Sequence, residues 1–192
     1  MSEKPNKAEL SSRASRVLLR KTALDLWLPS IELKVLDIGA GEGHVWSAIK
    51  KVRSVPEYTA VDKKPQMAGT LQADVTTAWI SSQSLWKYDV IDFDLYEFKA
   101  WELYLYTAMT ATKPLVVFIT PGKPGKSKGG LSNDIKMVLG IPMDWQVPDS
   151  KELSAYAASE CLSRGAAYAK AKEVLMVEQK GVMSFAVRFP GK

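Results

Sequence analysis

The last two strands that the sequence predicts, over residues 172–178 and 182–189, are joined by a link of three residues. This link constrains the fold most, because it is long enough for an antiparallel hairpin and too short for a crossover helix. Upstream of it, strands alternate with helices, which indicates a parallel sheet with right-handed crossovers. These earlier strands are predicted at residues 34–38, 58–62, 88–94 and 115–119, with a weak one ending near 73–74. The sequence therefore predicts an α/β, doubly wound, seven-stranded mixed sheet with a C-terminal antiparallel hairpin.

Helices are predicted between these strands from apolar residues at helical spacing. Residues 44–52 are expected to form one of them, with Val45, Ala48, Ile49 and Val52 facing inward. The others are predicted over residues 77–85, 98–112 and 150–170.

An N-terminal helical extension is predicted over residues 1–30, ahead of a single domain over residues 31–192. Its apolar residues fit one or two helices, which stop at Pro29. The cations on the polar side of this helix are Arg13, Arg16, Arg20 and Lys21. We interpret them as a solvated helix face, with a nucleic-acid contact as the alternative.

The composition is that of a soluble globular chain. Of the 192 residues, 46% are hydrophobic and 24% are charged, which excludes a disordered, a collagen-like or a disulfide-stapled chain. The polar N-terminus lacks the apolar stretch of a signal peptide, and no apolar run approaches the ~20 residues of a membrane span. With a single cysteine as well, we expect a cytoplasmic protein without a membrane segment. The net charge of +5 is compatible with an anionic partner but does not require one.

A glycine-rich turn follows the first buried strand, at residues 39–43. Its glycines let the backbone approach a ligand closely at the start of the next helix. Asp62 ends the second strand about twenty residues later, where an acidic side chain can accept both hydroxyls of an adenosine ribose. The third glycine comes one residue too early for the G-x-G-x-x-G pattern of nicotinamide and flavin sites, and His44 stands in its place. A nicotinamide oxidoreductase is therefore a distant alternative.

At these positions the chain resembles the class I, Rossmann-like, seven-stranded S-adenosylmethionine-dependent methyltransferases. Their first motif places an acidic residue before G-x-G-x-G, as Asp37 stands before Gly39, Gly41 and Gly43. The resemblance spans about residues 35–189 and implies S-adenosyl-L-methionine as the cofactor. The cofactor-binding residues that it implies are Asp37, Gly39, Ala40, Gly41, Gly43, Asp62, Lys63, Asp74, Val75 and Asp92.

The resemblance assigns these residues to different parts of the cofactor. Asp37 and the glycine backbone would hold the methionine end, and Asp62 would hold the ribose. Asp74 would accept the adenine amino group, with Val75 or Trp79 beside the ring. For Asp92 two interpretations remain, a place near the cofactor and a structural hydrogen bond.

A second motif follows the fourth strand, where ligands of open parallel sheets bind. Asp94-Leu95-Tyr96 resembles the strand-four motif of methyltransferases that modify exocyclic amino groups of nucleic acids, although both prolines of that motif are missing. The resemblance implies that Asp94 accepts a hydrogen bond from the amine and that Tyr96 stacks on the base. We therefore predict Asp94 and Tyr96 as the catalytic residues.

Three further expectations concern the surroundings of this site. The loop after the fifth strand is rich in Gly, Pro and Lys, and its Lys123, Lys126 and Lys128 are predicted to contact substrate phosphates. Cys161 and the aromatic residues of 98–106 are expected in the core, and His44 in the first turn of a helix. No cluster of ligands for a metal is found in the sequence.

The sequence thus predicts an S-adenosylmethionine-dependent methyltransferase that acts on an exocyclic amine of RNA or DNA. One alternative is a methyltransferase for small molecules or proteins, because the chain has no separate target-recognition domain. Another is a non-catalytic accessory protein that keeps the fold, because the strand-four motif is incomplete.

Overall fold

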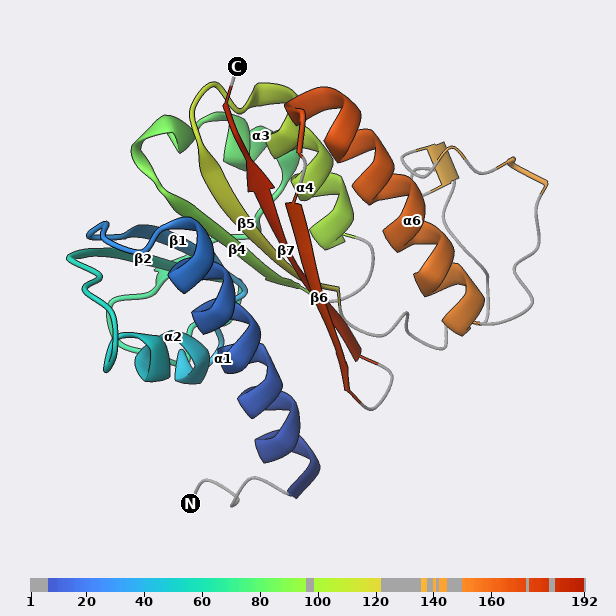
Figure 1. Ribbon diagram of the computed structural model, residues 1–192. Helices are drawn as coiled ribbons and strands as arrows, with labels where there is room; N and C mark the ends of the chain where they lie inside the picture. Colours follow the sequence, from blue (N-terminus) through green and yellow to red (C-terminus); the bar gives the residue numbers. More distant parts are fainter. Residues whose placement is uncertain are drawn as a thin grey trace.

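The computed structural model describes residues 7–95, 99–121, 136–137, 140, 142–144, 150–171, 173–179 and 182–191 (Figure 1). Its strands are β1 (Lys34–Ile38), β2 (Glu57–Asp62), β3 (Leu71–Gln72), β4 (Val90–Leu95), β5 (Leu115–Pro121), β6 (Glu173–Gln179) and β7 (Val182–Phe189). Its helices are α1 (Lys7–Trp27), α2 (His44–Ile49), α3 (Thr77–Ser81), α4 (Lys99–Thr110) and α6 (Ser150–Ala169), with a short 3-10 helix, η1 (Leu85–Lys87).

The strands form one seven-stranded sheet in the order β3-β2-β1-β4-β5-β7-β6. Strands β1 to β5 pair in parallel, whereas β7 runs antiparallel to both β5 and β6. The predicted mixed sheet with a C-terminal hairpin is therefore confirmed. The strand order reverses between β1 and β4, and in open α/β sheets this switch point is where ligands bind.

Helix α2 differs from its prediction in length and in the face that it buries. It ends at Ile49, and Val52 lies beyond it with 59% of its surface exposed, so the expectation that Val52 faces inward is wrong. Trp46 is buried instead, because its large ring packs against Tyr58 and Phe118 on the sheet. The helix predicted over residues 77–85 is likewise shorter, since α3 ends at Ser81 and η1 follows it.

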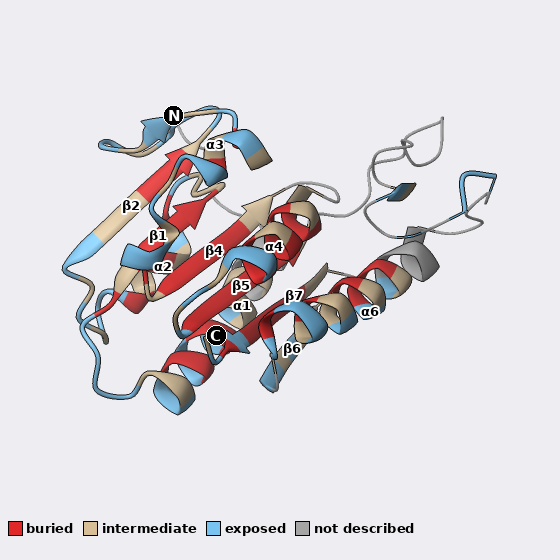
Figure 2. Cartoon of the chain, turned by 90° about the horizontal axis from the view of Figure 1, so that it is seen from above, coloured by how far each residue is buried: buried red, intermediate tan, exposed pale blue. Residues whose placement is uncertain are grey.

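Each face of the sheet has its own hydrophobic cluster. The α1 and α2 helices cover one face, where Leu24 and Trp46 pack on β1, β4 and β5. The α4 and α6 helices cover the other face, and Figure 2 shows how the buried residues concentrate in the central strands. No helix in the described part of the chain is both long and apolar enough to cross a membrane.

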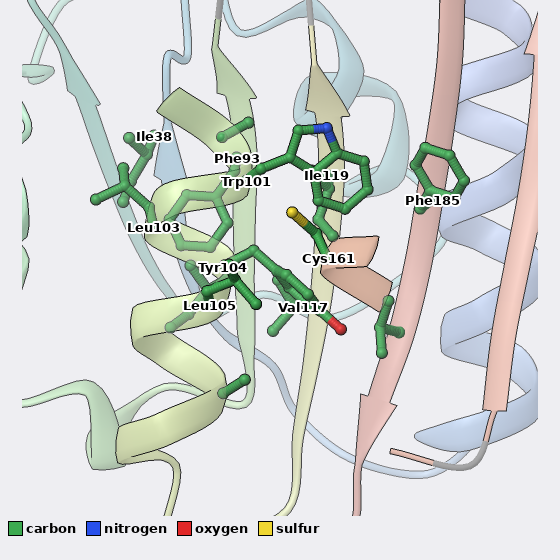
Figure 3. Packing of buried hydrophobic residues seen from close by; sticks show 14 of the residues in the cluster. Ile38, Phe93, Trp101, Leu103, Tyr104, Leu105, Val117, Ile119, Cys161 and Phe185 are labelled. Atoms are coloured by element: carbon green, nitrogen blue, oxygen red, sulfur yellow. The ribbon is translucent and has the colours of Figure 1, made fainter. Parts of the chain in front are cut away.

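The cluster under α4 and α6 contains the predicted core cysteine. Cys161 is fully buried there with Trp101 and Tyr104, as Figure 3 shows, which confirms the core expectation for these three residues. Burial raises the pKa of the Cys161 thiol to about 12, so the thiol stays neutral near pH 7.

Strand register decides which polar side chains share a face. Asp37 on β1 pairs with Asp92 on β4, and Asp94 pairs with Thr120 on β5. Side chains alternate along a strand and neighbouring partners point the same way, so these residues lie on one face of the sheet. It is the face that α1 and α2 cover.

Candidate active site

A cleft of about 960 Å³ opens at the carboxyl ends of the parallel strands, at the switch point of the sheet. Its walls come from the glycine turn after β1, the end of β2, residues 73–75 after β3, the end of β4 and one face of α1. The described residues of the two predicted motifs therefore meet in one cavity. This is the position in which α/β sheets of this kind bind ligands.

The glycine turn brings bare backbone to the cleft. Gly39, Gly41 and Gly43 all have positive φ angles, of 82°, 51° and 67°, which residues with a side chain rarely adopt. A Cβ atom on Gly39 would lie 2.0 Å from the carbonyl oxygen of Asp94, so only glycine fits between β1 and β4. A Cβ atom on Gly41 would meet nothing within 4 Å, so this position faces open space. The predicted close-approach turn is therefore present.

Asp62 is held in a fixed orientation beside this turn. Its Oδ2 accepts a hydrogen bond from the Gly41 amide at 2.9 Å, and its Oδ1 accepts one from the Lys64 amide at 2.7 Å. Each carboxylate oxygen has two lone pairs, so both retain capacity for a hydroxyl group. Two hydrogen bonds from the backbone thus preorganise the side chain predicted to bind a ribose.

The residues after β3 form the far wall of the cleft. Asp74 is 56% exposed and lies between the Lys63 and Lys99 ammonium groups, at 3.0 and 3.2 Å. Hydrogen bonds from these two lysines lower the pKa of Asp74, so it is ionised at neutral pH. Val75 is buried and lines the cleft, whereas Trp79 does not line it. Of the two residues predicted beside an adenine ring, only Val75 thus lines the cleft, and its contact with a ring stays a prediction.

Asp37 lies buried beneath the glycine turn, with 3% of its surface exposed. Its Oδ2 accepts a hydrogen bond from the Tyr58 hydroxyl at 2.5 Å. Burial, together with repulsion from Asp92, raises the pKa of Asp37 well above its ordinary value. A cation that entered the cleft would therefore favour the ionised form.

Asp92 lies deeper and makes a buried ion pair with α1. Its two oxygens accept hydrogen bonds from Nη2 and Nε of Arg20, each at 2.7 Å, and Oδ2 also accepts one from the Trp46 indole at 2.7 Å. Both oxygens are thus engaged within the protein. These contacts favour the structural interpretation of Asp92 over direct contact with a cofactor.

The interpretation of the α1 cations as a solvated helix face is wrong for Arg20, which is 1% exposed. Arg16 is only partly solvated, because its side chain is 24% exposed and forms an ion pair with Asp94. The interpretation holds for Lys21, which is exposed and pairs with Asp25. The reason is that α1 packs across the sheet with its arginines toward the carboxylates of β4. The alternation of Asp92 and Asp94 with the apolar Ile91 and Phe93 was the available sequence signal for that face.

Asp94 lies at the rim of the cleft, where Arg16 forms an ion pair with it. Its side chain is 30% exposed. Burial raises the pKa of Asp94, and the charge of Arg16 partly opposes this. The predicted residues Tyr96, Lys123, Lys126 and Lys128 lie outside the described residues. His44 begins α2, as predicted, and lines the cleft beside the glycine turn.

Comparison with known proteins identifies the fold through solved structures and not through sequence. No protein-family model and no curated protein sequence matches the chain. Among solved structures, a putative O-methyltransferase from Klebsiella pneumoniae is 12% identical, with a TM-score of 0.54 over 100% of this chain and 84% of that chain. A chain of the E. cuniculi Mtq2–Trm112 complex, responsible for the methylation of the eRF1 translation termination factor, is also 12% identical, with a TM-score of 0.50 over 99% and 98%. The chain therefore has the α/β, Rossmann-like methyltransferase fold.

Proposed function

We propose that the chain is an S-adenosylmethionine-dependent methyltransferase whose cofactor occupies the cleft at the switch point. The observation that carries this proposal is the bare glycine shelf, Gly39 to Gly43, facing the preorganised carboxylate of Asp62. A nucleoside fits this arrangement, because the shelf offers close backbone contact and Asp62 offers acceptors for ribose hydroxyls.

The remaining cofactor contacts follow from the walls of the cleft. Asp37 and the backbone of Gly39, Ala40, Gly41 and Gly43 would hold the methionine end, where the cofactor is cationic. Lys63 would flank the ribose, while Asp74 and Val75 would contact the adenine edge and face. Asp92 would act indirectly, by holding Arg20 and Trp46 in place.

The cofactor supplies an electrophilic methyl group, so the protein needs no nucleophile of its own. Its residues have to align the acceptor for in-line displacement and exclude water. Asp94, at the rim where β4 ends, can accept a hydrogen bond from an acceptor amine and assist loss of its proton. Tyr96, two residues on, is proposed to stack on the base that carries the amine.

We infer that the acceptor is an exocyclic amine of a nucleic acid. Two features support this inference, a carboxylate at the end of β4 and the arginines that α1 adds to the same cleft. A small-molecule or protein methyltransferase and a non-catalytic accessory protein are the outcomes against which the inference is tested.

The first test is calorimetric titration of the chain with S-adenosylhomocysteine, with NAD as the competing dinucleotide. We expect binding of the former and none of the latter. Asp62→Ala should weaken binding at least tenfold, because it removes the ribose acceptors. Glu173→Gln, an exposed substitution at the opposite edge of the sheet, is the matched control and should leave binding unchanged. Wild-type protein that fails to bind would refute the proposed function.

The second test is transfer of a radiolabelled methyl group to total RNA, DNA or cell extract. Label in a nucleic-acid pool is the expected result, and Asp94→Asn should reduce it by roughly 10²-fold or more while leaving cofactor binding intact. Label confined to proteins or small molecules would overturn the acceptor class. Cofactor binding with no transfer to any pool would identify a non-catalytic accessory protein.

A further inference from the structure

Three arginines form a stripe along one face of α1. Arg13, Arg16 and Arg20 are spaced by three and four residues, which places them on one side of a helix. All three line the cleft. Their environments differ from one end of the stripe to the other, and this difference indicates what each of them does.

Arg20 anchors the helix. It is fully buried, it pairs with Asp92, and its Nη1 donates to the backbone carbonyl of Arg16 at 3.2 Å. Its guanidinium also lies 5.2 Å from the centre of the Phe118 ring. These contacts fix the register of α1 on the sheet, so that Arg16 reaches Asp94 one turn earlier.

Arg16 and Arg13 lie on α1 before Arg20 and are less buried than Arg20. Arg16 pairs with Asp94 through Nη1, but its buried Nε has no hydrogen-bond partner within the described part of the chain. Arg13 lines the cleft half-buried and forms no ion pair with any residue whose side chain the structure describes, a set that begins at Ser12. Among the described side chains, Arg16 pairs with Asp94 and Arg13 pairs with none, so these side chains leave one positive charge and one buried donor, Nε of Arg16, without a partner. An anionic group fits both.

The Arg16–Asp94 pair also bears on the proposed chemistry. While Arg16 is paired with Asp94, its positive charge lowers the proton affinity of that carboxylate, so Asp94 is a weaker acceptor for the proton of an amine. A substrate that carries an anion next to its amine would resolve this conflict, because the anion competes with Asp94 for the guanidinium. A nucleotide unit carries both groups, an amine on the base and a phosphate on the backbone.

We propose that Arg13 and Arg16 form a phosphate site for the nucleic-acid substrate, and that phosphate binding draws Arg16 away from Asp94 and frees that carboxylate for the amine. This proposal rests on the proposed function for its acceptor. Its two arginines are not among the residues proposed to contact the cofactor, which belong to the glycine turn, the end of β2 and the segment after β3, although all of them line the same cleft.

The test uses the full chain and a short single-stranded oligo(dT), measured by fluorescence anisotropy over a series of salt concentrations. Thymine offers no exocyclic amine, so this probe reports phosphate contacts without the contact to Asp94. Arg13→Gln and Arg16→Gln should each weaken binding and reduce the slope of log affinity against log salt by about 0.7, the value for one phosphate contact on a single strand. Arg188→Gln, an exposed arginine on β7, is the control and should change neither quantity.

Asp94→Asn separates the proposed competition from a simple basic patch. Removing the carboxylate's charge releases Arg16, so this variant should bind oligo(dT) several-fold more tightly than wild type. Unchanged or weaker binding by Asp94→Asn would overturn the competition, and wild-type affinity in both arginine variants would overturn the site. Binding of S-adenosylhomocysteine by the same preparations is measured in parallel. Failure to bind oligo(dT) by a chain that binds the cofactor contradicts this inference and leaves the cofactor site standing.

Discussion

At the scale of single residues, the protonation of Asp37 should make ligand binding at the candidate site depend on pH. Burial and the neighbouring Asp92 raise the pKa of Asp37 in the free protein. Below that pKa the group is protonated, and binding of a cationic ligand must release the proton. Above it the carboxylate is already ionised. Affinity for S-adenosylmethionine should therefore rise with pH and level off above the pKa of Asp37.

Titration calorimetry across a pH series checks this expectation. Asp37→Asn should flatten the rise, because no proton is left to release. Tyr58→Phe removes the hydroxyl that stabilises the ionised carboxylate, and so it should move the rise to higher pH. Wild-type affinity that is constant or falls as pH increases would contradict this account of Asp37.

Two glycines of the turn differ in the space around them. Gly39→Ala places a Cβ atom 2.0 Å from the Asp94 carbonyl oxygen at a φ of 82°, so both overpacking and backbone strain oppose it. We expect a loss of about 2–5 kcal/mol in the free energy of unfolding. Gly41→Ala introduces backbone strain but no clash, so we expect it to lower the free energy of unfolding by about 1 kcal/mol. Its Cβ would project into open space where the proposed cofactor contacts the turn. Urea unfolding measures both variants, and equal losses would show that the contact with β4 is unimportant.

The sequence located those residues of the site whose role depends on local spacing. Asp37, the glycines and Asp62 all belong to strand ends and the turn beside them, and the structure brings them together in the cleft. Arg20 and Trp46 could not be placed in the same way. Their burial depends on which helix crosses which face of the sheet, and the periodicity within one helix does not determine that.

At the scale of elements, α1 is attached to the sheet by the buried Arg20–Asp92 pair, in which both side chains are 1% exposed. Arg20→Met leaves Asp92 as a buried charge with the Trp46 indole as its remaining donor. We expect this variant to lose about 3–5 kcal/mol of unfolding free energy. Removing both charges, in Arg20→Met with Asp92→Leu, should cost less than Arg20→Met alone. A double variant that is less stable than either single one would contradict the desolvation argument.

The contact between α4 and α6 contains an unusual polar group. The buried Tyr104 hydroxyl has no hydrogen-bond partner within the described residues. It packs directly against Gly165, where an added Cβ atom would lie 1.9 Å from the hydroxyl oxygen. Tyr104→Phe removes the unsatisfied group and keeps the ring in its cluster. We expect a gain of about 1 kcal/mol in unfolding free energy by chemical denaturation. A loss of stability would indicate that the hydroxyl has a partner after all.

Element positions were predicted well where hydrophobic patterning extends over a whole strand. The first strand and the last, residues 34–38 and 182–189, occur with the predicted bounds. Helix ends were less accurate, as in α2, because the positions up to Val52 continue an apolar spacing that the folded chain exposes. The sequence pattern alone does not show where tertiary packing stops.

At the scale of the whole molecule, strand order brings distant segments to one cavity. The switch between β1 and β4 opens the cleft, and α1 crosses the same face to add arginines from the start of the chain. The hairpin was predictable, because the link expected from the sequence is too short for a crossover helix. The number of strands was predictable from the alternation of strand and helix patterns before it. The placement of α1 was not, because no local rule assigns an N-terminal helix to a face.

A crystal structure of the chain with S-adenosylhomocysteine tests the central claim most directly. We predict that the ribose hydroxyls bind to the Asp62 carboxylate, that the adenine lies against Val75, and that the sulfur points toward the rim at Asp94. A cleft without the nucleoside at millimolar supply, or a nucleoside bound elsewhere on the molecule, would contradict the claim.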